Sequence, residues 1–330
     1  MKNKQSITQL FVTVTTCVLV VTSCMRSSGD EVVKTSFYHP YGPQLEENEW
    51  KSQGQSGEVI EMLKSGVQVR KVYSNGQFHG ECSWTFPYSK IVERTEEYEN
   101  GKKFLLSKNY ENGSPKYQEQ WLGGDHRIVH AWYEDGVPRL IEEYAGDLVV
   151  EGQYYTSEGE IESSVVGSSG LRTERSKIGL LLSREYVQKG VVSERETFYP
   201  NGQVSEIISL REGKREGKGR RFAESGEPIV IENWKDGRLD GMQLVFEGGQ
   251  PARQVPYSVG RKEGVELHFR PGTEEIVEEI AWHEDSRHGL CKTYLVDQTI
   301  EEWYWKGGRV TEEQYKIRDR ASLVSVHTGL

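Results

Sequence analysis

Few side chains in this sequence have the types and spacing that chemistry at an active site requires. Two histidine pairs, His126 with His130 and His283 with His288, could each supply two ligands to a zinc ion. Zinc sites in proteins use three or four such ligands, and the sequence places no third ligand beside either pair. The sequence therefore predicts no metal site and no cofactor.

The carboxylates in the segment KDGRLDG, Asp236 and Asp240, have a spacing compatible with calcium binding. The same two positions in the preceding, similar segment REGKREG hold Glu212 and Glu216. Their place beside glycine in both segments favours turn formation over metal binding.

A cluster of four glutamates offers the acid and base pair that a glycosidase needs. These residues are Glu274, Glu275, Glu278 and Glu279. Such closely spaced charges are more typical of a tight turn and a solvated strand face. The sequence also lacks a Gly-x-Ser-x-Gly elbow, a P-loop and a dinucleotide fingerprint, so it predicts no catalytic site.

The elements that must position all these residues are repeats, because one pattern occurs three times in tandem between residues 210 and 272. Each copy begins with a large apolar residue, has glycine at the third and seventh positions after it, and has an aromatic residue at position twelve. The first residues are Leu210, Trp234 and Tyr257, the glycines are Gly213, Gly217, Gly237, Gly241, Gly260 and Gly264, and the aromatic residues are Phe222, Phe246 and Phe269. A fixed period of this size indicates units that stack.

Each repeat has the features of a β-hairpin. Two short runs of alternating apolar and polar residues are separated by Asp-Gly or Asn-Gly pairs. These pairs tolerate positive φ at both central positions of a type I′ turn, whose twist matches that of the flanking strands. A helix is excluded, because glycine costs about 1 kcal/mol relative to alanine in a helix interior. The sequence therefore predicts an all-β fold of tandem β-hairpin repeats.

The same register extends from Trp50 to Trp305, and a glutamate recurs at the second position before the aromatic. This glutamate is Glu96, Glu119, Glu142 and Glu232. The mean step is about 23 residues, a period within the range of known stacked repeats. The pattern resembles the bacterial variant of the MORN repeat over residues 48–316.

The resemblance implies one elongated, twisted antiparallel sheet in a family associated with scaffolding, membrane proximity and protein contacts, without a common catalytic residue. Residues 161–185 depart from the pattern, so we expect a weak repeat or hinge there. Residues 317–330 should form a C-terminal cap or tail.

The repeat period places large aromatic side chains in two columns, with steps of about 9 to 10 Å between neighbours. One column holds Trp234, Tyr257, Trp282 and Trp305, and the other holds Phe222, Phe246, Phe269 and Tyr294. These columns are either the hydrophobic spine of the sheet or an uncovered groove for a partner protein, peptide or glycan.

Two cysteines, Cys82 and Cys291, lie within the repeats about nine units apart. On an extended sheet their separation is on the order of 80 to 90 Å, too far for a disulfide within one chain. They are either buried thiols or the two ends of an intermolecular bridge in an oxidising compartment.

Residues 1–23 have the features of a signal peptide. Lys2 and Lys4 precede an apolar run over residues 7–21 that is short for a membrane span. Val-Thr-Ser before Cys24 resembles a bacterial lipobox, which implies a lipoprotein held on the membrane by acyl chains on Cys24. Met25 in the next position indicates the outer rather than the inner membrane, by analogy with Gram-negative sorting. The alternative is an ordinary cleaved secretory signal.

Residues 24–47, rich in Ser, Gly, Pro and Glu, are predicted to be a flexible tether.

Charge limits the partners that the chain can bind. The sequence has 41 basic and 51 acidic residues and a net charge of −10. Such acidity argues against nucleic acid and against adhesion of the sheet to anionic lipid. Membrane attachment should therefore come from the acyl anchor alone.

Together these features predict a non-catalytic, membrane-anchored scaffold or binding module at the cell envelope. Its expected partner is another envelope protein or a second copy of itself. The alternatives are a self-associating structural protein joined through its terminal strands, and a glycan-processing hydrolase that uses the carboxylates. Some members of the resembled family carry an antitoxin label, which fits an exported chain poorly.

Overall fold

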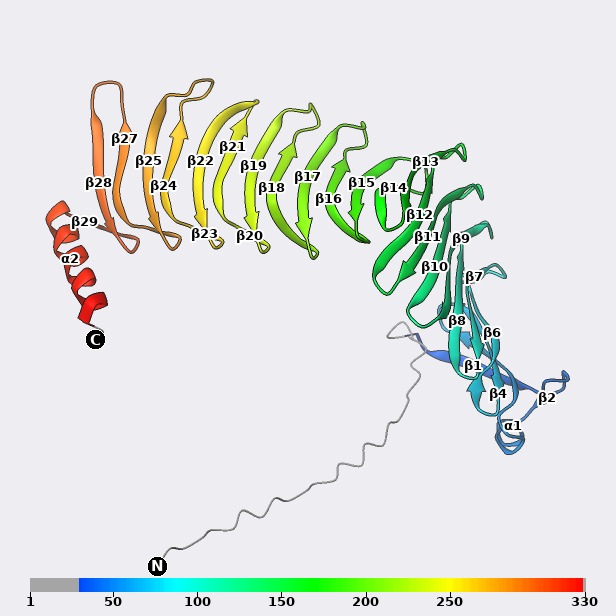
Figure 1. Ribbon diagram of the computed structural model, residues 1–330. Coiled ribbons are helices and arrows are strands. Elements are labelled where there is room, and N and C mark those ends of the chain that lie inside the picture. The colour runs from blue at the N-terminus through cyan, green and yellow to red at the C-terminus, as the bar shows by residue number, and fades with distance from the viewer. Residues whose placement is uncertain (1–29, 329–330) are drawn as a thin grey trace, which may run out of the picture.

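The computed structural model describes residues 30–328, which form one elongated, open antiparallel sheet with two helices (Figure 1). The predicted fold class is confirmed. The predicted signal peptide and Cys24 lie outside the described residues. Neither helix in this part of the chain has the length and hydrophobicity of a membrane span.

The elements follow one another along the sheet in hairpin order. Up to the middle of the sheet they are β1 (Val32–Tyr38), β2 (Gln44–Leu45), α1 (Glu47–Ser52), β3 (Gly57–Leu63), β4 (Gln68–Ser74), β5 (Gln77–Phe78), β6 (Gly80–Thr85), β7 (Val92–Glu99), β8 (Lys102–Asn109), β9 (Pro115–Gly123), β10 (His126–Trp132), β11 (Pro138–Ala145), β12 (Leu148–Tyr155), β13 (Ile161–Val166) and β14 (Ser169–Arg175). They continue with β15 (Leu181–Gln188), β16 (Val191–Phe198), β17 (Val204–Arg211), β18 (Lys214–Phe222), β19 (Pro228–Lys235), β20 (Arg238–Leu239), β21 (Gly241–Glu247), β22 (Gln250–Ser258), β23 (Arg261–Lys262), β24 (Gly264–Phe269), β25 (Ile276–His283), β26 (Ser286–Arg287), β27 (Gly289–Tyr294), β28 (Thr299–Trp305), β29 (Gly308–Val310) and α2 (Glu312–Thr328).

The predicted turn glycines have the expected conformations. Gly213, Gly237 and Gly260 have φ values of 75°, 78° and 85°, and the residue before each also has positive φ, as a type I′ turn requires. Each of the second glycines, Gly217, Gly241 and Gly264, also has positive φ. Gly241 and Gly264 each begin a new strand after a short break in the pairing.

Hydrogen bonds between successive repeats join the turns along this edge of the sheet. The Asp240 carboxylate accepts a hydrogen bond from the backbone N–H of Val259 at 3.1 Å, and the Gly260 N–H donates to the Leu239 carbonyl at 2.7 Å. Asp240 therefore holds the next turn in place, which supports turn formation as the reason for its presence.

Tyrosine hydroxyls make equivalent links along the opposite edge. Tyr110 donates to the carbonyl of Trp132 at 2.9 Å, and Tyr133 donates to that of Tyr155 at 2.7 Å. In the second half, Tyr199 donates to the carbonyl of Phe222 at 2.8 Å. The aromatic residue of the Tyr-x-Asn/Asp-Gly motif thus ties each hairpin to the next one.

The predicted tether was too long, because residues 32–45 belong to the sheet. Strand β1 pairs with β3 along its length, and β2 folds back onto its end. The Phe37 ring packs against Trp50 with 5.2 Å between the ring centroids. The segment VVKTSFY is rich in β-branched and aromatic residues, which favour a strand over a solvated linker.

The array ends earlier than predicted, at Val310 instead of Lys316, because α2 begins at Glu312. The Tyr315 ring of this helix lies against Trp303 and Trp305, with centroid distances of 5.0 and 5.5 Å. The helix therefore covers aromatic rings at the last strands, as a cap does.

The sheet changes direction sharply in its green segment, around strands β12 to β15, which we call the corner (Figure 1). Here β13 and β14 pair at only two positions. The backbone N–H of Ser168, at the tip of their hairpin, donates to the Val150 carbonyl, and the N–H of Gly190 donates to the Ser168 carbonyl, both at 2.8 Å. The Val149 N–H donates to the Gly190 carbonyl at 3.1 Å. Neighbouring hairpins thus meet across the tip of a shorter one.

The corner coincides with the region that we predicted to be weak or hinged. Its strands are regular and paired with their neighbours, so the array is not interrupted. A buried cluster of Val129, Ala131, Leu140, Val149, Tyr154, Val165 and Val187 lies on one face of the strands here, which we call the core face. These contacts favour a fixed bend over a hinge, although flexibility itself stays a prediction.

Candidate functional site

The first predicted aromatic column exists, but its last member was wrong. Trp234, Tyr257 and Trp282 each lie directly opposite the second glycine of the preceding repeat, and Tyr304 lies opposite Gly289 in the same way. Tyr304 rather than Trp305 therefore continues the column. Successive strand residues point to opposite faces, so a shift of one residue moves a side chain out of the column.

Cations and carboxylates cover the rings of this column. The Lys262 amine lies 4.4 Å from the centre of the Trp282 ring, and the Arg215 guanidinium lies 5.0 Å from that of Trp234. The Trp234 indole donates a hydrogen bond to the buried Glu232 carboxylate at 3.1 Å. Because cations interact favourably with ring faces, this ladder stabilises the sheet. It also explains the glutamate that recurs just before the aromatic.

The second predicted column lies where each long strand ends and the pairing register shifts. Phe222, Phe246 and Phe269 pair with Pro228, Pro251 and Ile276 after such a shift, and Tyr294 pairs with Thr299. All eight predicted aromatic residues are half-buried. This burial fits the structural spine better than an open groove.

The other chemically suggestive residues are not assembled into sites. His283 and His288 stack with 5.4 Å between ring centroids, yet within residues 30–328 no three His, Cys, Asp or Glu side chains could hold a metal ion together. Glu275 forms an ion pair with Arg270 at 2.8 Å within one turn. Glu278 contacts the His268 ring at 3.1 Å.

Both cysteines of the repeats are buried thiols and form no disulfide within the described residues; Cys82 is fully covered and Cys291 is 7% exposed. Burial raises the pKa of the Cys291 thiol, which lowers its fraction of reactive thiolate.

We expect a single monomer band after non-reducing electrophoresis. A bulky maleimide should label the folded protein slowly, and two thiols per repeat array should react after denaturation. A band at twice the mass that a reductant removes would support the intermolecular bridge instead.

A hollow of about 410 Å³ lies at the corner and was not found from the sequence. Its apolar walls are Ile128, Ile141, Ile161 and Val166, and His130 also lines it. Burial lowers the pKa of His130, so this ring is neutral near pH 7. In the cross-strand register Ile128 lies opposite Glu143, next to the Val129–Glu142 pair. The hollow therefore opens on the face opposite the core face, which we call the groove face.

Two carboxylates, Glu143 and Glu151, lie directly opposite each other on neighbouring strands of this hollow. Glu151 accepts a hydrogen bond from the Gly167 N–H at 2.9 Å. Among the ion pairs of the described residues, neither carboxylate has a cationic partner. Like charges directly opposite each other destabilise a sheet. The hollow thus combines apolar walls with uncompensated negative charge, which suits a cationic group flanked by apolar surface.

The core face of the same strands holds the hollow in shape. The Glu142 carboxylate accepts hydrogen bonds from the hydroxyls of Tyr144 and Tyr154 at 2.7 and 2.9 Å. The Arg172 guanidinium bridges Glu142 at 2.6 Å and Glu185 at 3.1 Å. These contacts join β11, β14 and β15, so the charged groups on this face connect the two arms of the corner.

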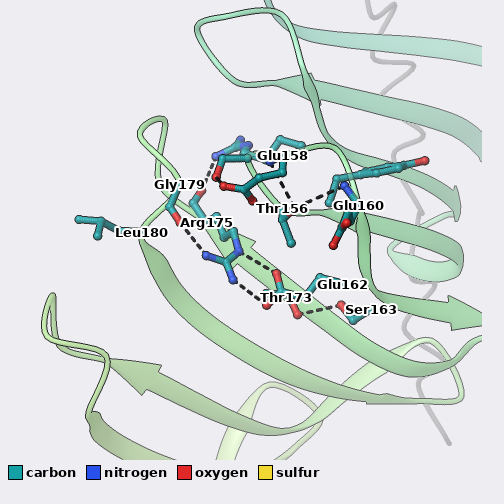
Figure 2. Close-up of polar contacts among 12 residues, drawn as sticks. Thr156, Glu158, Glu160, Glu162, Ser163, Thr173, Arg175, Gly179 and Leu180 are labelled. Carbon is teal, nitrogen blue, oxygen red and sulfur yellow. Dashed lines mark hydrogen bonds and ion pairs between the residues drawn. The ribbon is translucent and has the colours of Figure 1, made fainter.

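Polar contacts also fix the wide turns at the other end of the corner strands, as Figure 2 shows. Arg175 makes two hydrogen bonds to the Glu162 carboxylate, both at 2.7 Å, and donates to the Gly179 carbonyl at 2.6 Å. The hydroxyls of Ser163 and Thr173 lie 2.7 Å apart. Leu180 points away from this network into solvent (Figure 2).

Large apolar side chains are exposed at many positions of the corner and its flanks. They are Leu148, Ile161, Val166, Ile178, Leu180, Leu182, Tyr186 and Val191. The aromatic repeat signal is weakest in this same part of the sequence. That coincidence was one sequence signal for the hollow.

Comparisons with known proteins identify no relative that shares the sequence. No protein-family model and no curated protein matches the chain. Among solved structures, the chain is similar to part of the TcdB2–TccC3–Cdc42 assembly, with 12% identity, a TM-score of 0.17, and coverage of 76% of this chain and 18% of that chain. It is also similar to BamB from Moraxella catarrhalis, with 11% identity, a TM-score of 0.15, and coverage of 76% of this chain and 82% of that one.

Proposed function

We propose that this protein is a non-catalytic repeat scaffold of the MORN-variant type, anchored at the cell envelope through acylated Cys24, and that the hollow at the corner binds a partner protein. The observation that carries the proposal is the Glu143–Glu151 pair within apolar walls. A partner segment with a lysine or arginine beside apolar residues would relieve the repulsion and cover the exposed apolar surface.

The surrounding structure supports binding over catalysis. The wide single sheet presents a long surface, and the corner contacts of Arg172 and Arg175 keep the hollow preformed. Preformed sites lose less conformational entropy when they bind a ligand. Of the carboxylates that a hydrolase would use, Glu275 is instead paired with Arg270 in a turn, and Glu278 and Glu279 lie in β25 against His268 and the Tyr294 hydroxyl.

Replacing Glu143 by glutamine tests this proposal, because it should affect stability and binding in opposite directions. Removing one of two opposed charges should stabilise the sheet by roughly 0.2 to 1 kcal/mol. The same change should reduce recovery of a crosslinked partner from intact cells several-fold, when the protein is tagged after Leu330. Urea unfolding and quantified affinity capture measure the two effects.

The matched control is Glu301→Gln. Glu301 lies on β28 at the far end of the sheet, opposite Lys292 on β27. This variant should capture the partner as well as the wild type does. Equal recovery with Glu143→Gln would remove the hollow from the proposal, and recovery of the chain alone would support self-association. A Cys24→Ala chain that fractionates with membranes as the wild type does would contradict the anchor.

A further inference from the structure

The N-terminal end of the sheet has a second hollow, of about 440 Å³, next to the loop between β3 and β4. Val33, Met62 and Tyr88 line it together with Lys64 and Lys90. Val33 is 65% exposed and Tyr88 is 86% exposed. An aromatic ring, aliphatic side chains and lysines on one surface are the composition of a protein–lipid boundary.

Tyr88 is held in an unfavourable backbone conformation although its side chain contributes little to the core. Its φ of 55° lies in the left-handed region, where a bulky residue is an outlier. The ring packs on Gly66, at which a Cβ atom would lie 2.5 Å from the ring, and the Tyr88 N–H donates to the Gly66 carbonyl at 3.0 Å. The contacts therefore hold an exposed aromatic ring against the loop between β3 and β4, with its hydroxyl 3.5 Å from the Lys64 carbonyl, which is a reason to expect a role at a surface.

The chain enters the sheet at this same hollow. The Asp30 carboxylate accepts hydrogen bonds from the Ser65 N–H, at 3.1 Å, and from the Ser65 hydroxyl. The Lys64 N–H donates to the Glu31 carbonyl at 2.8 Å. Cys24 precedes Asp30 closely, and a segment of about six residues spans at most about 20 Å when fully extended. An acyl chain on Cys24 would therefore keep the bilayer surface close to this hollow.

We propose that the N-terminal end of the sheet docks directly on the lipid bilayer, with Tyr88, Val33 and Met62 at the boundary between headgroups and acyl chains. Lys90 and Lys64 lie beside them, where their amines would meet lipid phosphates. The Lys64 amine also lies 3.4 Å from the exposed Glu31 carboxylate, and exposed pairs of this kind are weak. This inference rests on the proposed acylation of Cys24. It extends the sequence-based expectation, in which the acyl chains alone attach the protein, because docking fixes the orientation of the sheet on the membrane.

The test uses the full mature chain, purified with its anchor and reconstituted into phosphatidylethanolamine–phosphatidylglycerol vesicles. An environment-sensitive fluorophore is attached in one variant at Lys90→Cys and in another at Val296→Cys. Val296 is 91% exposed in the equivalent turn at the other end of the sheet, between β27 and β28. The buried Cys82 and Cys291 stay in place, and the unsubstituted chain measures their background labelling.

Lipids brominated in their acyl chains should quench the label at position 90 several-fold more than the label at position 296. Adding Tyr88→Ser should remove most of that difference while the vesicles still carry the protein during flotation. Equal quenching at both positions, or none at position 90 in a chain that floats, would overturn docking and leave the anchor intact. A chain that does not float with the vesicles would overturn both the anchor and the docking.

Discussion

Replacing Arg172 by methionine is expected to lower the free energy of unfolding of the corner by about 3 to 5 kcal/mol, because it leaves the buried Glu142 carboxylate without its cation. Glu185 loses one of its two cations and keeps Arg195, at 2.6 Å. Glu142 is 2% exposed and Glu185 is 5% exposed. Methionine keeps much of the arginine's length and apolar contact, so the loss would come mainly from charge. Few single substitutions outside a core cavity have effects of this size.

Repeat arrays can unfold in pieces, so the measurement should locate the loss. Hydrogen exchange of the backbone amides of β11 and β14 reports the opening of the corner, and urea unfolding reports the whole chain. Arg261→Met is the matched control. Arg261 pairs with Glu284 at 3.2 Å with both side chains largely exposed, and exposed pairs contribute about 0 to 1 kcal/mol.

A second variant separates charge from shape at this position. Combining Arg172→Met with Glu142→Gln removes the stranded charge, while the amide oxygen can still accept a hydrogen bond from one tyrosine hydroxyl and the amide NH2 can donate to the other. We expect this double variant to recover part of the lost stability. Equal, small losses in Arg172→Met and Arg261→Met would show that the buried cluster is not what holds the corner together.

The hairpins could be predicted from the sequence because their causes are local. Asp-Gly and Asn-Gly pairs determine the turn type, and the turn determines the register of the strands beside it. The tether error had a local cause too, since the composition of residues 24–47 outweighed the β-branched and aromatic residues of VVKTSFY. Trp305 was misplaced because the last step of the column, from Trp282 to Tyr304, is shorter than the mean period. Counting a constant period of about 23 residues from Trp282 therefore leads to Trp305, the residue after Tyr304.

The contacts that form the corner could not be predicted, because they join residues far apart in the sequence. Arg172 meets Glu142 across two intervening strands, and Val149 meets Gly190 across an intervening hairpin. The hollow was partly predictable. Glu142 lies two positions before Tyr144 and so belongs to the core face, which places the adjacent Glu143 on the opposite face. The position of Glu151 opposite Glu143 could not be predicted. That pairing depends on the register across a bulge between β11 and β12.

Replacing Gly170 by alanine is expected to destabilise the corner by about 3 kcal/mol or more, for two independent reasons. The φ of Gly170 is 149°, a region open essentially only to glycine. A Cβ atom there would lie 2.2 Å from the backbone carbonyl oxygen of Ser164 and 2.9 Å from the Cα of Val165. Neither is the end of a flexible side chain, so β13 and β14 would have to move apart. Small-angle X-ray scattering should then show a change in the maximal dimension of the array, together with a lower midpoint of urea unfolding.

Gly167 in the same hairpin provides the control, because it also has positive φ, at 55°, but a Cβ atom would meet nothing within 4 Å. Gly167→Ala should therefore cost only about 1 kcal/mol, the usual penalty of the left-handed conformation, and leave the scattering curve unchanged. If both variants lose the same small amount of stability and keep the shape of the wild type, the close approach of β14 to Ser164 does not set the bend. If only Gly170→Ala straightens or loosens the array and also weakens capture of the partner, the bend itself is what shapes the hollow for binding.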